Sequence, residues 1–162
     1  MCCFGKIDSC ILKYKNNITG IILAGEKGTR MGTDKGFMLW NEKPFVQHSI
    51  DALKPLVDDI LMISDHASYA TLGYSRIPDS LSEAGLLSGI YSGLIASATK
   101  LSLILSCDVP LINSIILEKI IAHYNENAAA VVCLADNKIM PLLALYHKNC
   151  YYLCKSLFDS GE

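Results

Sequence analysis

A short apolar run that opens into a basic, glycine-bearing loop most limits how this chain can fold. Residues Ile18–Leu23 are rich in β-branched side chains, which is typical of a buried strand. The loop that follows contains three glycines and three cations: Gly25, Gly28, Gly32, Lys27, Arg30 and Lys35. Glycine lets backbone amides approach a ligand closely, and the cations favour an anionic ligand. Residues 18–35 therefore predict a phosphate-binding loop at the end of a buried strand.

Strand-type and helix-type apolar patterns alternate along the rest of the chain. The later expected strands are 59–64, 74–78, 101–107, 128–134 and 142–146. One expected helix begins near Pro44, and three others cover 85–98, 114–124 and 151–158. This order predicts β-α-β units with right-handed crossovers in one doubly wound α/β domain over residues 18–162. Residues 1–17 show no clean periodicity and are expected to form an N-terminal extension.

The composition excludes several classes of protein. Hydrophobic residues make up 51% of the 162 residues and charged residues 19%, which argues for a well-buried core and against disorder. No apolar run is long enough to span a bilayer, and the N-terminus lacks a signal-peptide layout, so a cytoplasmic protein without a membrane partner is expected. A net charge of −2 gives no general attraction to nucleic acid.

The seven cysteines do not indicate a metal site or a disulfide framework. Their number is odd and the chain has no Cys-x-x-Cys pair. We expect reduced thiols, with Cys107 and Cys133 acting as small core residues.

Two common phosphate-binding motifs, the P-loop and the dinucleotide-binding glycine motif, do not match this loop. No Gly-Lys-Ser/Thr occurs in the chain, and the glycines at 25, 28 and 32 do not fit G-x-G-x-x-G. The remaining possibility is a longer basic loop in which Arg30 and Lys35 neutralise a polyphosphate. Asp108 directly follows the expected strand 101–107, and ligands of such sheets bind outside the carboxyl ends of the strands. The loop and Asp108 are therefore expected to form one site.

Glycines also recur every four residues in the expected helix 85–98, at Gly85, Gly89 and Gly93. Glycine costs about 1 kcal/mol relative to alanine inside a helix, so its repetition needs a reason. The pattern predicts that this helix closely approaches the sheet or a ligand.

Residues 23–35, Leu-Ala-Gly-Glu-Lys-Gly-Thr-Arg-Met-Gly-Thr-Asp-Lys, resemble the signature loop of the molybdenum cofactor guanylyltransferases. The resemblance continues in order through 43–45, 78–80, 85–90, 107–110 and 140–146. It implies a three-layer Rossmann-like nucleotidyltransferase fold with a mostly parallel central sheet. It also implies transfer of GMP from GTP to molybdopterin with release of pyrophosphate. The implied partners are these two substrates, together with molybdoenzymes or other cofactor-biosynthesis proteins.

The resemblance also implies roles for individual residues. Arg30, Lys35 and Asp108 would be catalytic, with the two cations holding the triphosphate and Asp108 coordinating Mg²⁺. Nucleotide-binding positions would be Leu23, Ala24, Gly25, Lys35, Ser64, Asp79 and Asp108. Such a reaction needs charge neutralisation and positioning more than a covalent nucleophile.

Three departures from the family pattern leave alternatives open. Glu26 stands where the family has a second glycine, and Leu86 stands where it has a proline. No Asn-Thr-Pro-like motif follows residues 151–158, so the nucleotidyltransferase domain is expected to be incomplete at its C-terminus. The alternatives are a related transfer that uses CTP or another phosphorylated acceptor, and a non-catalytic nucleotide-binding accessory protein.

Overall fold

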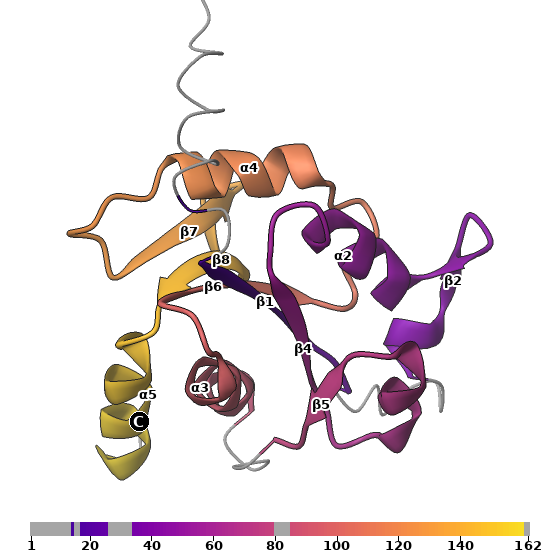
Figure 1. Cartoon of the computed structure of the whole chain (residues 1–162), viewed down its shortest axis with the longest axis horizontal. Helices are drawn as coiled ribbons and strands as arrows, with labels where there is room; N and C mark the ends of the chain where they lie inside the picture. The colour runs from indigo at the N-terminus through magenta and orange to yellow at the C-terminus, as the bar shows by residue number, and fades with distance from the viewer. Residues whose placement is uncertain (1–13, 15–16, 26–33, 80–84, 161–162) are drawn as a thin grey trace, which may run out of the picture.

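A central sheet organises the protein (Figure 1). The computed structural model describes Tyr14 and residues 17–25, 34–79 and 85–160. The sheet has six strands in the order β5-β4-β1-β6-β8-β7. Their bounds are Ile18–Leu23 (β1), Asp59–Ile63 (β4), Ser75–Ile77 (β5), Leu101–Ser106 (β6), Ala130–Ala135 (β7) and Lys138–His147 (β8). The expected strands are thus confirmed, although β8 begins four residues before the expected start at 142 and β7 begins two residues after the expected start at 128.

Helices cover both faces of this sheet, which gives the expected three layers (Figure 1). The α-helices are Phe45–Leu53 (α2), Leu86–Ala96 (α3), Ser114–Ala122 (α4) and Cys150–Ser160 (α5). α2 and α4 pack on the face that carries Ile22 and Leu103, while α3 and α5 pack on the face that carries Ile21 and Ile104. Consecutive strand residues therefore enter opposite cores, which explains why the central strands are apolar throughout.

The last two strands depart from the β-α-β pattern expected along the whole chain. β1, β4, β5 and β6 run parallel, but β8 runs antiparallel to both β6 and β7. Asp136 and Asn137 join β7 to β8, both at positive φ (48° and 60°), and two such residues form a tight hairpin turn. A two-residue turn leaves no room for a crossover helix, so β8 folds back between β6 and β7. The sheet is nevertheless mostly parallel, as the resemblance implied.

The glycines of α3 lie against β1, which confirms that this helix approaches the sheet closely. A Cβ atom on Gly89 would lie 3.3 Å from Leu23 Cδ1, and one on Gly93 would lie 2.8 Å from Ile21 Cγ2. Gly85 precedes the helix at a φ of 61°, which favours glycine. Close packing here brings the start of α3 toward the carboxyl end of β1.

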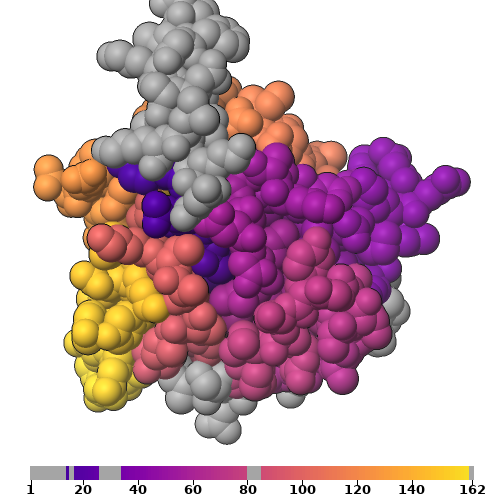
Figure 2. Space-filling model, viewed as in Figure 1, coloured from indigo at the N-terminus to yellow at the C-terminus, as the bar shows by residue number. Residues whose placement is uncertain are grey.

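Short elements connect β1 to α2 and β4 to β5. These are the 3₁₀ turns Lys35–Phe37 (η1) and Ala67–Leu72 (η2) and a small antiparallel hairpin of Leu39–Trp40 (β2) with Lys43–Pro44 (β3). The hairpin projects from the body of the molecule (Figure 2), with Leu39 and Trp40 exposed. Among the described residues, no helix has the length and apolar character to cross a bilayer. The expected extension 1–17 lies mostly outside the described residues.

Candidate active site

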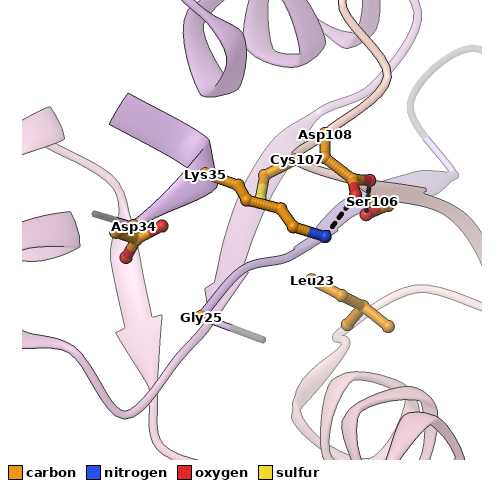
Figure 3. A pocket seen from close by; sticks show the side chains of 7 residues that line it. All are labelled: Leu23, Gly25, Asp34, Lys35, Ser106, Cys107 and Asp108. Atoms are coloured by element: carbon orange, nitrogen blue, oxygen red, sulfur yellow. Dashed lines mark hydrogen bonds and ion pairs between the residues drawn. The ribbon is translucent and has the colours of Figure 1, made fainter. Parts of the chain in front are cut away.

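A pocket lies at the carboxyl ends of the adjacent parallel strands β1 and β6 (Figure 3). It is lined by Leu23, Gly25, Asp34, Lys35, Ser106, Cys107 and Asp108. From β1 the chain proceeds to β4 and β5 on one side, and it then crosses back to β6 on the other side. The pocket therefore sits at a topological switch point, where open α/β sheets bind their ligands. The Cys107 amide continues the pairing by donating to the Leu23 carbonyl at 3.0 Å.

Lys35 and Asp108 face each other across this pocket (Figure 3). The distance from Lys35 Nζ to Asp108 Oδ2 is 3.6 Å, and their side chains are 45% and 35% exposed. An ion pair this open to water contributes less than about 1 kcal/mol, so both groups can exchange this contact for a ligand. The Ser106 hydroxyl donates to Asp108 Oδ1, which orients the carboxylate from its own strand. The site thus offers one cation and one oriented carboxylate.

Asp34 holds the turn that carries Lys35. Its Oδ1 accepts hydrogen bonds from the Gly36 amide at 3.0 Å and from the Tyr69 hydroxyl at 2.6 Å. Tyr69 is fully buried, and this burial, together with the Asp34 carboxylate, raises the pKa of Tyr69 well above its usual range. The Tyr69 hydroxyl therefore keeps its proton and remains a hydrogen-bond donor. Asp34 Oδ2 is buried and has no hydrogen-bond partner within the described part of the chain.

Cys107 lies beside Asp108 but is not a nucleophile. Burial, reinforced by the Asp108 charge, raises the pKa of the Cys107 thiol to about 12. The thiol is therefore neutral near pH 7, and the thiolate is the reactive form. Cys107 is 5% exposed, which confirms its prediction as a small core residue, whereas Cys133 is only partly buried.

We expect Cys107 to resist iodoacetamide at pH 8 in the native protein and to react fully in denaturant. The cause is the small thiolate fraction combined with burial. Peptide mass spectrometry after timed alkylation measures the modified fraction at this site. Labelling of native Cys107 at the rate seen in denaturant would contradict the assignment.

The backbone of residues 23–25 borders the pocket, and Ser64 supports it from behind. The Ala24 amide donates to the Ile63 carbonyl at 2.9 Å. Gly25 has a φ of +96°, and a Cβ there would lie 2.9 Å from Ser64 Oγ. Ser64 is 2% exposed, and its hydroxyl accepts from the His66 amide at 3.1 Å. Ser64 therefore contacts Gly25 without lining the pocket.

Asp79 lies farther along the same edge of the sheet, after β5. The hydroxyls of Ser88 and Ser92 from α3 donate to its Oδ1, the latter at 3.3 Å, and its amide donates to Asp65 Oδ1 at 3.0 Å. Asp79 does not line the pocket beside Asp108. Arg30, like Glu26, lies outside the described residues.

Sequence reasoning missed three residues that shape the site: Asp34, Tyr69 and Ser106. Asp34 precedes Lys35 directly, and an aspartate before a turn is a recognisable capping signal. Ser106 lies two residues before Asp108 on the same strand end. Tyr69 gave no local signal, because its partners come from distant parts of the chain.

The donor atoms of the pocket fit a magnesium ion shared with phosphate oxygens. Within the described residues, no group of three or more His, Cys, Asp or Glu side chains could enclose a metal. Mg²⁺ usually takes only one or two carboxylates and fills its remaining positions with phosphate oxygens and water. Asp108 provides such a carboxylate, partly exposed toward the pocket, with the Ser106 hydroxyl beside it.

Known proteins resemble this chain both in sequence and in structure. Residues 20–162 match the MobA-like NTP transferase domain family. A probable molybdenum cofactor guanylyltransferase of Flavobacterium johnsoniae is 38% identical over 145 residues, which is 90% of this chain and 76% of the relative. The molybdenum cofactor guanylyltransferase of Shewanella sediminis is 31% identical over 150 residues, again 90% of this chain and 76% of the relative.

Two solved structures share the fold. Molybdopterin-guanine dinucleotide biosynthesis protein A from Archaeoglobus fulgidus has a TM-score of 0.70 at 18% identity, with 88% of this chain and 74% of that chain covered. A nucleotidyl transferase from Methanothermobacter thermautotroptrophicus has a TM-score of 0.71 at 16% identity, with 89% of this chain and 76% of that chain covered. At these identities the likeness establishes the nucleotidyltransferase fold. With a family match over most of its length and relatives above 30% identity, this chain belongs to the molybdenum cofactor guanylyltransferases of the MobA-like NTP transferase family.

Proposed function

We propose that this protein transfers GMP from GTP to a phosphate of molybdopterin, with release of pyrophosphate. The observation that carries the proposal is the Lys35–Asp108 pair, 3.6 Å apart beside the backbone of Gly25. A cation for phosphate, a carboxylate for a metal and a glycine that permits close approach are what nucleotidyl transfer needs. The names of the relatives, which are guanylyltransferases, supply the substrates.

The transfer is a direct displacement at phosphorus. An oxygen of the acceptor phosphate attacks the α-phosphorus of GTP and forms the new P–O bond. The bond from that phosphorus to the bridging oxygen breaks, and pyrophosphate leaves with the electron pair. No protein nucleophile enters this scheme, which agrees with the neutral, buried thiol of Cys107. The protein's task is to neutralise charge and align the two phosphates.

Three residues would hold the phosphates and the metal. Lys35 would act as a point charge on the triphosphate, and Arg30 would add a planar, bidentate contact. Asp108, oriented by Ser106, would hold Mg²⁺ together with phosphate oxygens. When bound, Mg²⁺ neutralises charge that builds on those oxygens.

The remaining positions would hold the nucleoside. Leu23, Ala24 and Gly25 would present backbone groups to it. Asp79 follows β5 along the same edge, where a base or ribose could lie beside the triphosphate, and the buried Ser64, which follows β4, would support the Gly25 backbone from behind. The hydroxyls of Ser88 and Ser92, which donate to the Asp79 carboxylate, would keep it in place for this contact. We further propose that the reaction occurs in the cytoplasm, with molybdoenzymes or other cofactor-biosynthesis proteins as partners.

The direct test supplies the protein with GTP, Mg²⁺ and a molybdopterin acceptor, and it measures pyrophosphate and the dinucleotide product. The Flavobacterium johnsoniae relative serves as a parallel reaction. Absence of both products while that relative turns over would overturn the proposed activity. Product formation from CTP in place of GTP would identify the related cytidylyl transfer. Mg²⁺–GTP binding in calorimetry without turnover would identify a nucleotide-binding accessory protein.

Replacing Lys35 by alanine is expected to lower kcat/KM about 10–100-fold, because one phosphate-neutralising charge is lost. Lys43→Ala is the matched control. Lys43 also pairs with an aspartate, Asp51, at 2.7 Å, and its side chain is 43% exposed against 45% for Lys35. It does not line the pocket. Initial rates over a range of GTP concentrations measure both variants, and equal losses in the two would reject the role of Lys35.

A further inference from the structure

Lys35 stands on a turn that is too short to fix its own position. η1 spans Lys35–Phe37, and 3₁₀ hydrogen bonds are weak in such short pieces. What anchors the turn is the Asp34 carboxylate, which accepts from Gly36 inside the turn and from Tyr69 outside it. Tyr69 belongs to η2, which follows β4, so the anchor comes from a distant segment of the chain.

Tyr69 also contacts this turn at Gly36 and Phe37. A Cβ atom on Gly36 would overlap the Tyr69 hydroxyl, so glycine permits this close approach. The ring of Phe37 packs on the Tyr69 ring with a centroid distance of 4.8 Å. With the hydrogen bond to Asp34, Tyr69 thus touches the residues on both sides of Lys35. Any movement of the Tyr69 hydroxyl would be transmitted to the backbone that carries the Lys35 ammonium group.

The Tyr69 side chain also lies in the same buried core as the opposite wall of the pocket. Tyr69 and Cys107 belong to one core cluster, and Cys107 immediately precedes Asp108. The turn that carries Lys35 is therefore fixed to a side chain that is itself fully buried beneath the pocket. The position of Lys35 relative to Asp108 depends on where this side chain lies.

We infer that Tyr69 is a positioning residue, which sets the position of Lys35 relative to Asp108 through its hydrogen bond to Asp34 and its packing on Gly36 and Phe37. The inference rests on the proposed function in that the pair serves nucleotidyl transfer. Tyr69 itself lines no part of the pocket, so it acts through the residues it holds.

Tyr69→Phe removes the hydroxyl and keeps the ring that packs on Phe37. We expect kcat/KM for guanylyl transfer to fall about 10–100-fold, since small displacements of positioned groups have effects of this size. Tyr146→Phe is the matched control, because its half-buried hydroxyl donates to the Pro141 carbonyl at 2.9 Å, away from the pocket lining. It should change kcat/KM less than twofold, and an equal loss in both variants would overturn the inference.

A double-mutant cycle separates positioning from general loosening of the fold. If Tyr69 acts through Lys35, Tyr69→Phe should have almost no further effect on kcat/KM in the Lys35→Ala background. Additive losses would overturn the inference. Asp34→Ala removes the acceptor from the same hydrogen bond and should behave like Tyr69→Phe, both alone and in the cycle. It decides the question if Tyr69→Phe does not fold.

Crystal structures of the wild type and Tyr69→Phe, without substrates, test the inference independently of activity. We expect the variant to lose the Lys35–Asp108 contact through a shift of η1. An unchanged turn with the ammonium still beside the carboxylate would overturn the positioning role. If the wild type forms no product, the proposed function fails, while this structural comparison still decides the role of Tyr69.

Discussion

Asp108→Asn is expected to reduce guanylyl transfer about 10²–10³-fold, which is typical for removal of one electrostatic group from an active site. Asparagine has the shape of aspartate, and its amide oxygen can still accept the Ser106 hydrogen bond. The negative charge is lost, however, and with it both the ion pair to Lys35 and the carboxylate proposed for Mg²⁺. The Mg²⁺ concentration needed for half-maximal rate should also rise. Initial rates measured over a Mg²⁺ titration report both effects.

Asp51→Asn provides the control for this substitution. Asp51 pairs with Lys43 at 2.7 Å, and its side chain is 46% exposed against 35% for Asp108. Burial raises the pKa of Asp51, but the hydrogen bonds from Lys43 and Gln47 and the charge of Lys43 together outweigh it and lower the pKa below its usual value. The control therefore removes a charge that is present at neutral pH. A loss below about threefold for Asp108→Asn at saturating Mg²⁺ and GTP would reject the catalytic role of this carboxylate.

Gly93→Val is expected to lower the free energy of unfolding by about 2–3 kcal/mol, as overpacking of a dense core does. A Cβ at this position would already lie 2.8 Å and 3.0 Å from two side-chain carbons of Ile21, which is fully buried in β1. Valine adds two further methyl groups, so α3 must move away from the sheet. For a domain of this size the melting temperature should fall by roughly 4–12 °C.

Ala96→Val tests whether valine in α3 is harmful by itself. Ala96 is the last residue of the same helix and is exposed, so the added methyl groups meet water. Calorimetric melting of the wild type and both variants should show a large shift only for Gly93→Val. A melting temperature for Gly93→Val within about one degree of wild type would mean that this helix can move away from β1 at little cost.

Local patterns in the sequence were sufficient to place most strands and helices. β1 occupies the predicted residues Ile18–Leu23, and α4 begins at the predicted Ser114. Such segments can be predicted because burial on one or both faces leaves a periodic or continuous apolar pattern in neighbouring residues. The glycine spacing in α3 likewise predicted a close approach, since a missing side chain is itself a local signal.

The order and direction of the strands in the sheet were harder to predict from the sequence. Nothing local to residues 138–147 distinguishes a strand that returns antiparallel between β6 and β7 from one added in parallel. The two positive-φ residues of the hairpin turn, Asp136 and Asn137, decide this by leaving no length for a helix. The order of the strands is a property of contacts between distant segments.

For the pocket, the sequence by itself determined the charged components: a basic glycine loop that ends at Lys35, and Asp108 after a buried strand. The tertiary structure decided how they are held. Asp34 and Tyr69 come from separate segments and meet through one buried hydroxyl. A single hydrogen bond between distant residues leaves no period or spacing in the sequence, so the position of Lys35 relative to Asp108 became visible only in the fold.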